Sequence, residues 1–173
     1  MWRSLVAFLL REQGVGGSNP LIPKIHYEVE ILVNLLRENA IPPSYQSEHA
    51  AGLDLCACLE APLCIKSGEA IAVPTGIAIA IDIGFEGQIR SRSGLALHHN
   101  IIVPNSPGTI DSDYRGEVKV ILLNLGKEDY LIQPNERIAQ LVIAPVYKVN
   151  VQIVMDLPET ERGKGGFGSS GKI

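Results

Sequence analysis

The stretch from Arg162 to Gly171 combines glycines with side chains that bind phosphate. Glycines allow successive backbone N–H groups to converge on an anion, and Arg162 offers a planar guanidinium to phosphate oxygens. Ser169 and Ser170 add hydroxyl donors, and Phe167 offers a ring on which a base can stack. Alone, the stretch is described more simply as a flexible Gly/Ser tail. A Walker phosphate loop is excluded, because Ile173 occupies the position of the Mg²⁺-binding Ser or Thr.

Two earlier segments also gather polar side chains next to glycine. Residues 108–116 place Asp111, Asp113 and Tyr114 in a turn that enters an apolar strand, and residues 90–96 group Arg, Ser and Gly in a manner suited to phosphate. An Asp-rich turn and an ordinary basic turn are the plainer interpretations of these two segments. Asp54 and Gln140, each considered alone, are more often structural residues.

Taken in order along the chain, five segments resemble the five signature motifs of the dUTPase family. They are Ala51 to Ala57, Arg92 to Ala96, Gly108 to Gly116, Arg137 to Leu141, and Arg162 to Gly171. The resemblance extends from about Lys24 to the C-terminus, and agreement on all five motifs is far more specific than any one of them. Leu53 stands where an aromatic residue is common and Ser91 where proline is common, but neither is a catalytic position of the family.

The resemblance implies an enzyme that cleaves dUTP to dUMP and pyrophosphate, which limits uracil incorporation into DNA and supplies dUMP for dTMP synthesis. It implies Mg²⁺ as cofactor, chelated by the triphosphate and by waters. It also implies a homotrimer of all-β jelly-roll (β-clip) barrels with a swapped C-terminal arm and active sites shared between subunits. The partners are then dUTP and two further copies of the chain, with no nucleic acid and no membrane.

Residue roles follow from the same resemblance. Asp111 is the expected general base for the attacking water, and Asp54 is expected to hold a metal-bound water. Tyr114 would pack under the deoxyribose and exclude a 2′-hydroxyl, while Phe167 would stack over uracil as the arm closes. The substrate-binding residues implied are Arg92, Ser93, Gly94, Asn105, Gly108, Tyr114, Gln140, Arg162, Phe167, Gly168, Ser169 and Ser170. Asn105 and the backbone near Gly108 would read the uracil edge, and the Arg, Ser and Gln side chains would bind phosphates.

Two other functions fit a related fold. A dCTP deaminase of the same superfamily would share the nucleotide site, but its catalytic Glu beside the second motif has no match here. A non-catalytic dUTP-binding protein would not require Asp111, Arg92, Gln140 and Phe167 together.

The elements that must position these residues are mostly strands. Ile77, Ile79, Ile81 and Ile83 alternate with smaller or polar residues, which predicts a strand. The stretch 118–123 is apolar on both faces, as in a buried strand or one at a subunit interface. Glycines and prolines separate such runs at the spacing of an all-β sandwich. Short helices are predicted only for Ser93 to Asn100 and Val33 to Glu38.

Composition agrees with one globular domain, because 46% of the 173 residues are hydrophobic and 20% are charged. A net charge of −4 argues against a general nucleic-acid coat. Cys56, Cys58 and Cys64 indicate neither a disulfide framework nor a zinc site, and we expect a cytoplasmic, reducing location. The adjacent histidines His98 and His99 receive no role.

The breaker-rich junction around residues 14–23 predicts a loosely attached extension over residues 1–23. Its apolar run Leu5 to Leu10 is too short for a membrane span and lacks a cleavage site. We therefore expect a jelly-roll domain over residues 24–157 and a glycine-rich arm over residues 158–173 that closes the active site.

Overall fold

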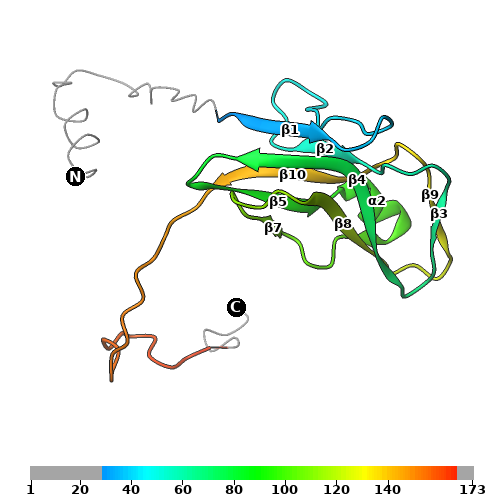
Figure 1. Cartoon of the computed structure of the whole chain (residues 1–173). Helices are drawn as coiled ribbons and strands as arrows, with labels where there is room; N and C mark the ends of the chain where they lie inside the picture. The colour runs from blue at the N-terminus through cyan, green and yellow to red at the C-terminus, as the bar shows by residue number, and fades with distance from the viewer. Residues whose placement is uncertain (1–28, 167–173) are drawn as a thin grey trace, which may run out of the picture.

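The computed structural model describes residues 29–166, and within them the chain forms antiparallel β-sheets with one short helix (Figure 1). The expected all-β class is confirmed. The extension 1–23 and the start expected near Lys24 lie outside the described residues. So do four of the expected substrate-binding residues, namely Phe167, Gly168, Ser169 and Ser170.

Two four-stranded sheets and a small two-stranded sheet make up the body. The first sheet has the order β1 (Ile31–Leu35), β4 (Ala70–Ile81), β8 (Glu117–Asn124) and β6 (Ile101–Ile102). The second has the order β2 (Leu53–Cys56), β10 (Arg137–Pro145), β5 (Phe85–Ser91) and β7 (Gly108–Ile110). The small sheet pairs β3 (Leu63–Ile65) with β9 (Tyr130–Ile132), and helix α2 (Ser93–His99) follows β5.

The core contains side chains from both large sheets. Ile77 and Ile79 of β4 are buried together with Leu55 of β2 and Leu141 of β10. The alternation seen in the sequence thus marks a real strand, but that strand ends at Ile81. Ile83 lies in the following turn and is 95% exposed, because Gly84 takes a φ of +95° there and reverses the chain into β5.

One of the two expected helices is present. The prediction for Ser93 to Asn100 is confirmed by α2, which Asn100 ends in the left-handed conformation with φ 57°. The prediction of a helix over Val33 to Glu38 is wrong. Residues 31–35 instead form the edge strand β1, whose pairing with β4 overrides the local helical preference. The described helix, seven residues long, cannot cross a membrane.

Strand β8 has one face buried in this chain and one face partly exposed. Val118, Val120 and Leu122 are buried, whereas Lys119 and Ile121 on the other face are exposed. The second apolar face predicted from the sequence is therefore available to a neighbouring molecule.

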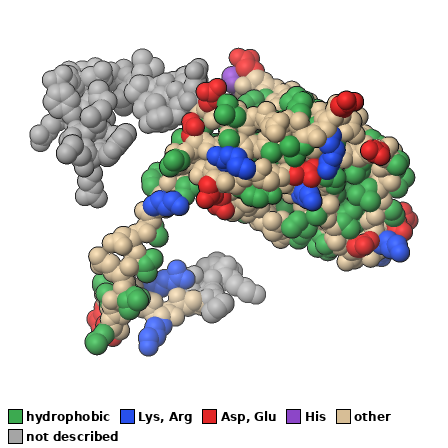
Figure 2. Space-filling model, in the orientation of Figure 1, with side chains coloured by type: hydrophobic (Ala, Val, Ile, Leu, Met, Phe, Trp, Pro, Cys, Tyr) green, Lys and Arg blue, Asp and Glu red, His purple; other side chains and the backbone are tan. Residues whose placement is uncertain are grey.

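Residues 146–166 leave the body as an extended segment (Figure 1). Together with residues 167–173, this segment is here called the arm. Apolar side chains alternate along it and are at least 79% exposed at Tyr147, Val149, Val151 and Ile153. Figure 2 shows apolar side chains of the arm exposed away from the body. Such alternation is typical of a strand that packs one face against a partner.

Candidate active site

Asp54 is the centre of a polar cluster on the second large sheet. Gln140 lies opposite it on β10, and its Nε2 donates to Asp54 Oδ1 at 3.1 Å. The Arg137 Nη1 donates to Asp54 Oδ2 at 3.0 Å, and the Arg92 Nη2 lies 3.8 Å from the same oxygen. Asp54 is only 3% exposed, so the two guanidinium groups compensate a buried charge. Residues of three sequence motifs thus meet in one place.

Arg92 is held from two sides. Besides its ion pair with Asp54, its Nη1 donates to the backbone oxygen of Arg137 at 2.7 Å. Ser93 and Gly94, which begin α2, are exposed, and a β-carbon at Gly94 would meet no atom within 4 Å. The chain directly after Arg92 is therefore exposed and open at Gly94, as an anion site requires.

Arg137 is a site residue that sequence reasoning missed, although it belongs to the fourth motif. Residues 137 and 140 are three apart, so a regular strand would point their side chains to opposite faces. The ladder with β2 is irregular between Arg137 and Ala139, and this bulge brings Arg137 to the face of Gln140. Gln46 joins from a loop by accepting a hydrogen bond from Arg137 Nη1 at 3.0 Å. A one-residue bulge leaves no periodic signal in the sequence.

Cys56 lies next to this cluster, since it pairs with Arg137 in the ladder. Burial, and then the charge of Asp54, raise the pKa of the Cys56 thiol. A raised pKa reduces the fraction of nucleophilic thiolate at neutral pH. Cys58 is buried in the core. Both observations indicate that Cys56 and Cys58 are packing residues rather than nucleophiles.

Asp111 lies in a second polar cluster, in the turn after β7. The backbone N–H of Tyr114 donates to the carbonyl of Asp111 at 3.1 Å, and Arg115 Nη1 donates to the carbonyls of Ser112 and Tyr114, both at 2.7 Å. The Asp111 carboxylate is exposed. A cavity of about 470 Å³ opens beside it, lined by Ala72, Thr109, Ile110, Asp111, Tyr114, Glu117, Lys119 and Ile121. That volume is within the range of small-ligand sites.

Two glycines of this region are required by close contacts. A β-carbon at Gly116 would lie 2.6 Å from Tyr114 Cζ, so the Tyr114 ring packs directly on the glycine. The hydroxyl of Tyr114 donates to the Glu117 carbonyl at 3.0 Å. A β-carbon at Gly108 would lie 2.9 Å from Asn105 Nδ2, so these two expected residues are in contact as well. The Tyr114 ring lines the cavity beside Asp111, whereas Asn105 packs at the other end of β7, on Gly108.

The two clusters lie at opposite ends of β5. Ile110, just before Asp111, pairs with Gly87 near the start of β5, whereas Gln140 pairs with Arg90 and Arg92 follows the end of the strand. The five residue-to-residue steps from position 87 to position 92 span about 16 Å. Within residues 29–166, no hydrogen bond or ion pair joins Asp111 to the Asp54 cluster.

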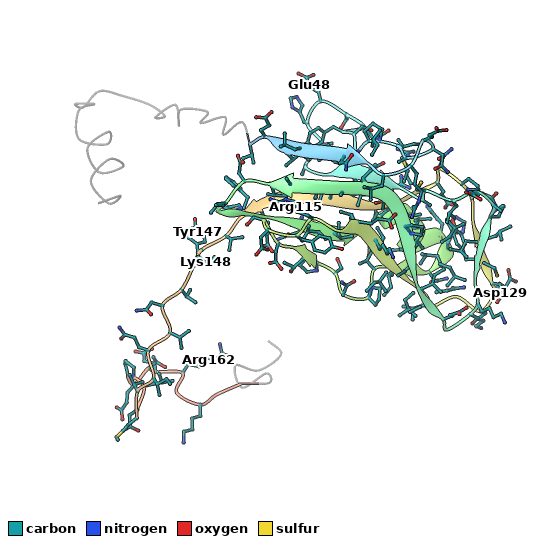
Figure 3. The ribbon with its side chains drawn as sticks, in the orientation of Figure 1. Glu48, Arg115, Asp129, Tyr147, Lys148 and Arg162 are labelled. Carbon is teal, nitrogen blue, oxygen red and sulfur yellow. The ribbon has the colours of Figure 1, made fainter. Side chains whose placement is uncertain are left out.

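Arg162 lies in neither cluster. It is exposed on the arm, away from the sheets (Figure 3), and its Nε donates to the Gly165 carbonyl at 2.8 Å within a local turn. Among the described residues, the other N–H groups of this guanidinium have no partner, so they can meet another molecule.

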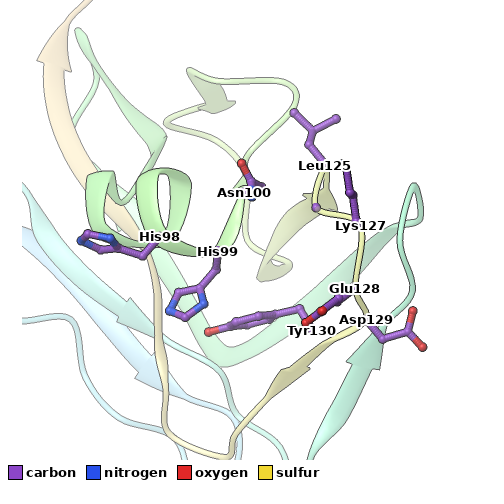
Figure 4. Close-up of a pocket in the computed structure, with 9 residues that line it drawn as sticks. His98, His99, Asn100, Leu125, Lys127, Glu128, Asp129 and Tyr130 are labelled. Atoms are coloured by element: carbon purple, nitrogen blue, oxygen red, sulfur yellow. The ribbon is translucent and has the colours of Figure 1, made fainter.

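A further hollow of about 490 Å³ lies between the end of α2 and the turn from β8 to β9 (Figure 4). The His99 ring faces that of Tyr130, with 5.1 Å between the ring centres. The Tyr130 hydroxyl donates to Glu136, and burial with this hydrogen bond raises the pKa of Tyr130. Because Glu136 precedes Arg137, these contacts support the start of β10 rather than add to the polar clusters.

Comparison with known proteins identifies the family. The dUTPase family model matches residues 38–171. The chain is 52% identical over 143 residues to the deoxyuridine 5′-triphosphate nucleotidohydrolase of Syntrophotalea carbinolica, covering 83% of this chain and 97% of that protein. It is 58% identical over 129 residues to the enzyme of the same name from Rickettsia felis, covering 75% and 87% respectively.

Solved structures agree with the sequence relatives. A point mutant of the Staphylococcus bacteriophage 80alpha dUTPase, in a structure with dUpNHpp, is 27% identical and superposes with a TM-score of 0.71 over 82% of this chain and 98% of the phage chain. The β-fold described above is therefore the dUTPase fold. With the family model covering all but the first residues of the described body, the chain belongs to the dUTPase family of nucleotidohydrolases.

Proposed function

We propose that this protein hydrolyses dUTP to dUMP and pyrophosphate by in-line attack of water on the α-phosphorus. The observation that carries the proposal is the meeting of three separate motifs. Arg92 and Gln140, from two of them, contact the buried carboxylate of Asp54, from the third. The relatives named deoxyuridine 5′-triphosphate nucleotidohydrolase and the phage dUTPase solved with dUpNHpp support the same substrate.

The Asp54 cluster is suited to the phosphate chain. Arg92 has N–H groups beyond the two that contact Asp54 and the Arg137 carbonyl, and the exposed Ser93 and Gly94 lie beside it. These donors would neutralise the charge that develops on the leaving pyrophosphate. Gln140 would hold the phosphates through the part of its amide that Asp54 leaves free.

Asp111 would supply the base. In the proposed step its carboxylate takes a proton from water, the water oxygen bonds to the α-phosphorus, and the bond from that phosphorus to the bridging oxygen breaks. The electron pair leaves with pyrophosphate. The exposure of Asp111 beside a cavity of about 470 Å³ allows both water and substrate to reach it.

The cavity beside Asp111 would bind the nucleoside. Tyr114 would pack under the deoxyribose, where a 2′-hydroxyl would clash with the ring. The Asn105 amide would read the uracil edge together with the backbone of β7, which is the last strand of its sheet and has one edge unused by that sheet. Phe167 would stack over the base, while Gly168, Ser169, Ser170 and Arg162 would close over the phosphates.

Mg²⁺ fits this arrangement as an ion carried by the triphosphate. Asp54 accepts hydrogen bonds from Gln140 on one oxygen and Arg137 on the other, so its carboxylate retains lone pairs for a metal-bound water. When bound, the ion would neutralise phosphate charge and help fix the geometry of the triphosphate. Asp54 would act on it through water rather than as a direct ligand.

The active site would be shared within a homotrimer. Asp111 and Arg92 lie at opposite ends of β5, and Arg162 lies on an arm that leaves the body. The exposed apolar face of β8 and the alternating apolar side chains of the arm offer surfaces for neighbouring copies. One site would then take its phosphate cluster, its base and its arm from different subunits.

In the cell, the reaction would limit uracil incorporation into DNA and supply dUMP for dTMP synthesis. We place it in the cytoplasm, where the free thiols of Cys56, Cys58 and Cys64 would remain reduced.

Pyrophosphate release from dUTP, dTTP, dCTP and UTP, with and without Mg²⁺, tests the function. We expect pyrophosphate release from dUTP but not from the other three nucleotides. Chelation of Mg²⁺ should abolish this release. Ammonia release from dCTP would instead identify a deaminase, and binding of dUTP without turnover would identify a non-catalytic binding protein.

A further inference from the structure

Glu117 gathers donors from three segments of the chain. The Arg37 guanidinium binds the Glu117 carboxylate as a two-pronged fork, with Nη1 2.7 Å from Oε1 and Nη2 3.2 Å from Oε2. The backbone N–H of Gly76 donates to Oε1 at 3.0 Å, and Lys119 Nζ lies 4.0 Å from Oε2. The Glu117 side chain is only 13% exposed, whereas Arg37 is 44% exposed. A fork of this kind fixes both the position and the plane of the carboxylate.

The Gly76 contact closes a bulge in the sheet. The ladder between β4 and β8 is irregular between Pro74 and Ala78, and Gly76 within it has a φ of +70°. A β-carbon there would lie 2.6 Å from Cys58 Sγ, so only glycine fits. Its carbonyl accepts from the N–H of Leu36 at 2.8 Å, next to Arg37. Because a buried N–H needs an acceptor, Glu117 completes the bulge and Arg37 holds Glu117 in place.

Glu117 is also the residue to which Tyr114 is tied. The Tyr114 hydroxyl donates to the Glu117 backbone carbonyl at 3.0 Å, and the Tyr114 ring packs on Gly116. Both residues line the cavity next to Asp111. A shift of the Glu117 backbone would therefore move the acceptor of the Tyr114 hydroxyl and, with it, the ring.

We propose that Arg37 and Glu117 form a positioning pair that holds the Tyr114 ring and thereby sets discrimination between deoxyribose and ribose. The inference rests on the proposed function and adds to it a residue outside the motifs. Arg37 lies before residues 38–171, the stretch matched by the dUTPase family model. Its contact spans 80 positions in the sequence.

The test is the ratio of kcat/KM for dUTP to that for UTP, measured on the full-length protein. Arg37→Ala and Glu117→Gln should each lower this ratio about tenfold, since a small displacement of the ring admits the 2′-hydroxyl. Arg37→Lys retains the charge but not the fork, so it should give an intermediate ratio. The kcat of Arg37→Ala with dUTP should remain within about threefold of wild type, because Arg37 does not contact the reacting atoms.

A double-mutant cycle separates a pair from two independent effects. If Arg37 and Glu117 act together, the double variant should lose no more selectivity than either single variant. Val120→Ala is the matched structural control, because it opens a cavity in the buried face of β8, whereas Tyr114 is 43% exposed. That control should lower the melting temperature and leave the nucleotide ratio unchanged. A crystal structure of Arg37→Ala should show the Tyr114 hydroxyl displaced from the Glu117 carbonyl.

Unchanged ratios in Arg37→Ala and Glu117→Gln, or an equal loss of selectivity in Val120→Ala, would overturn the inference. If Arg37→Ala fails to fold, a wild-type ratio in Arg37→Lys with an unmoved Tyr114 overturns it equally. Wild-type protein that does not prefer dUTP to UTP would contradict the proposed function instead. A selective wild type with unchanged variants would contradict only the positioning pair.

Discussion

Gln140 faces Asp54 across the ladder between β10 and β2, and its amide donates to the carboxylate at 3.1 Å. Arg137 reaches the other oxygen of the same carboxylate. A single buried acidic group therefore orients an amide and a guanidinium toward one face of the sheet. Each oxygen of the Asp54 carboxylate accepts a hydrogen bond, so an asparagine amide, which has only one acceptor oxygen, cannot replace it.

Asp54→Asn should reduce both stability and substrate binding. The new NH₂ group would oppose a donor of either Gln140 or Arg137, and the compensating charge would be lost. We expect a decrease in the free energy of unfolding of about 1–3 kcal/mol, measured by urea denaturation, and a raised KM for Mg²⁺–dUTP. Asp82→Asn, in the exposed turn after β4, is the control and should change neither quantity. An Asp54→Asn protein as stable and active as wild type would contradict the role of the cluster.

Asp111→Asn should keep dUTP binding and lower kcat about 10²-fold or more, because it removes the base while preserving size. Single-turnover kinetics and equilibrium binding of dUTP would separate these two quantities. Asp113→Asn alters the same exposed turn and should retain most of the activity. Equal losses in both variants would assign the effect to the turn rather than to the base.

Gly116→Ala should disturb the Tyr114 ring, because the added methyl group would overlap it. We expect a lower kcat/KM for dUTP and a smaller preference over UTP, with the remainder of the fold intact by circular dichroism. Wild-type selectivity in this variant would show that the ring does not discriminate between the sugars.

Removal of residues 167–173 should reduce kcat/KM steeply while leaving the melting temperature nearly unaltered, because a glycine-rich segment has little apolar area to bury. Deletion of residues 1–20 is the matched truncation and should leave both activity and assembly unchanged. A large decrease in melting temperature after the C-terminal deletion would assign the arm a structural role instead.

Chains with Asp111→Asn and chains with Arg162→Ala should complement each other when they are refolded together. If each site takes Asp111 from one subunit and Arg162 from another, random trimers from an equal mixture should recover about a quarter of wild-type activity. Pyrophosphate release per chain provides the measurement, and differently tagged chains would verify subunit exchange. Exchange without recovered activity would place the base and the arm residue in the same chain and exclude the shared site.

Local patterns in the sequence predicted much of the body. The alternation of Ile77, Ile79 and Ile81 identified β4, and the short helix after Arg92 was also anticipated. The strand at the start of segment 33–38 was not anticipated. β1 forms because it pairs with β4, about 45 residues later, and local propensity does not depend on that pairing.

The candidate site was predictable only in part for the same reason. Asp54 and Gln140 belonged to recognisable motifs, and the structure placed them in contact. Arg137 reaches them through a bulge, and Arg37 reaches Glu117 across 80 positions. Neither contact follows a periodic pattern in the sequence, so only the tertiary structure reveals them.

The order of the strands along the chain has a consequence for biosynthesis. Every strand pairing of the described body lies within residues 31–145, so no strand of the two large sheets needs the arm in order to pair. Domains generally fold as units during synthesis, beginning with the part made first. A newly made chain would therefore fold its body while its arm still has no neighbouring chain to close on. In the shared-site arrangement its activity would begin only when other finished chains are nearby, and the onset of dUTP turnover after induction would rise more steeply than the amount of protein.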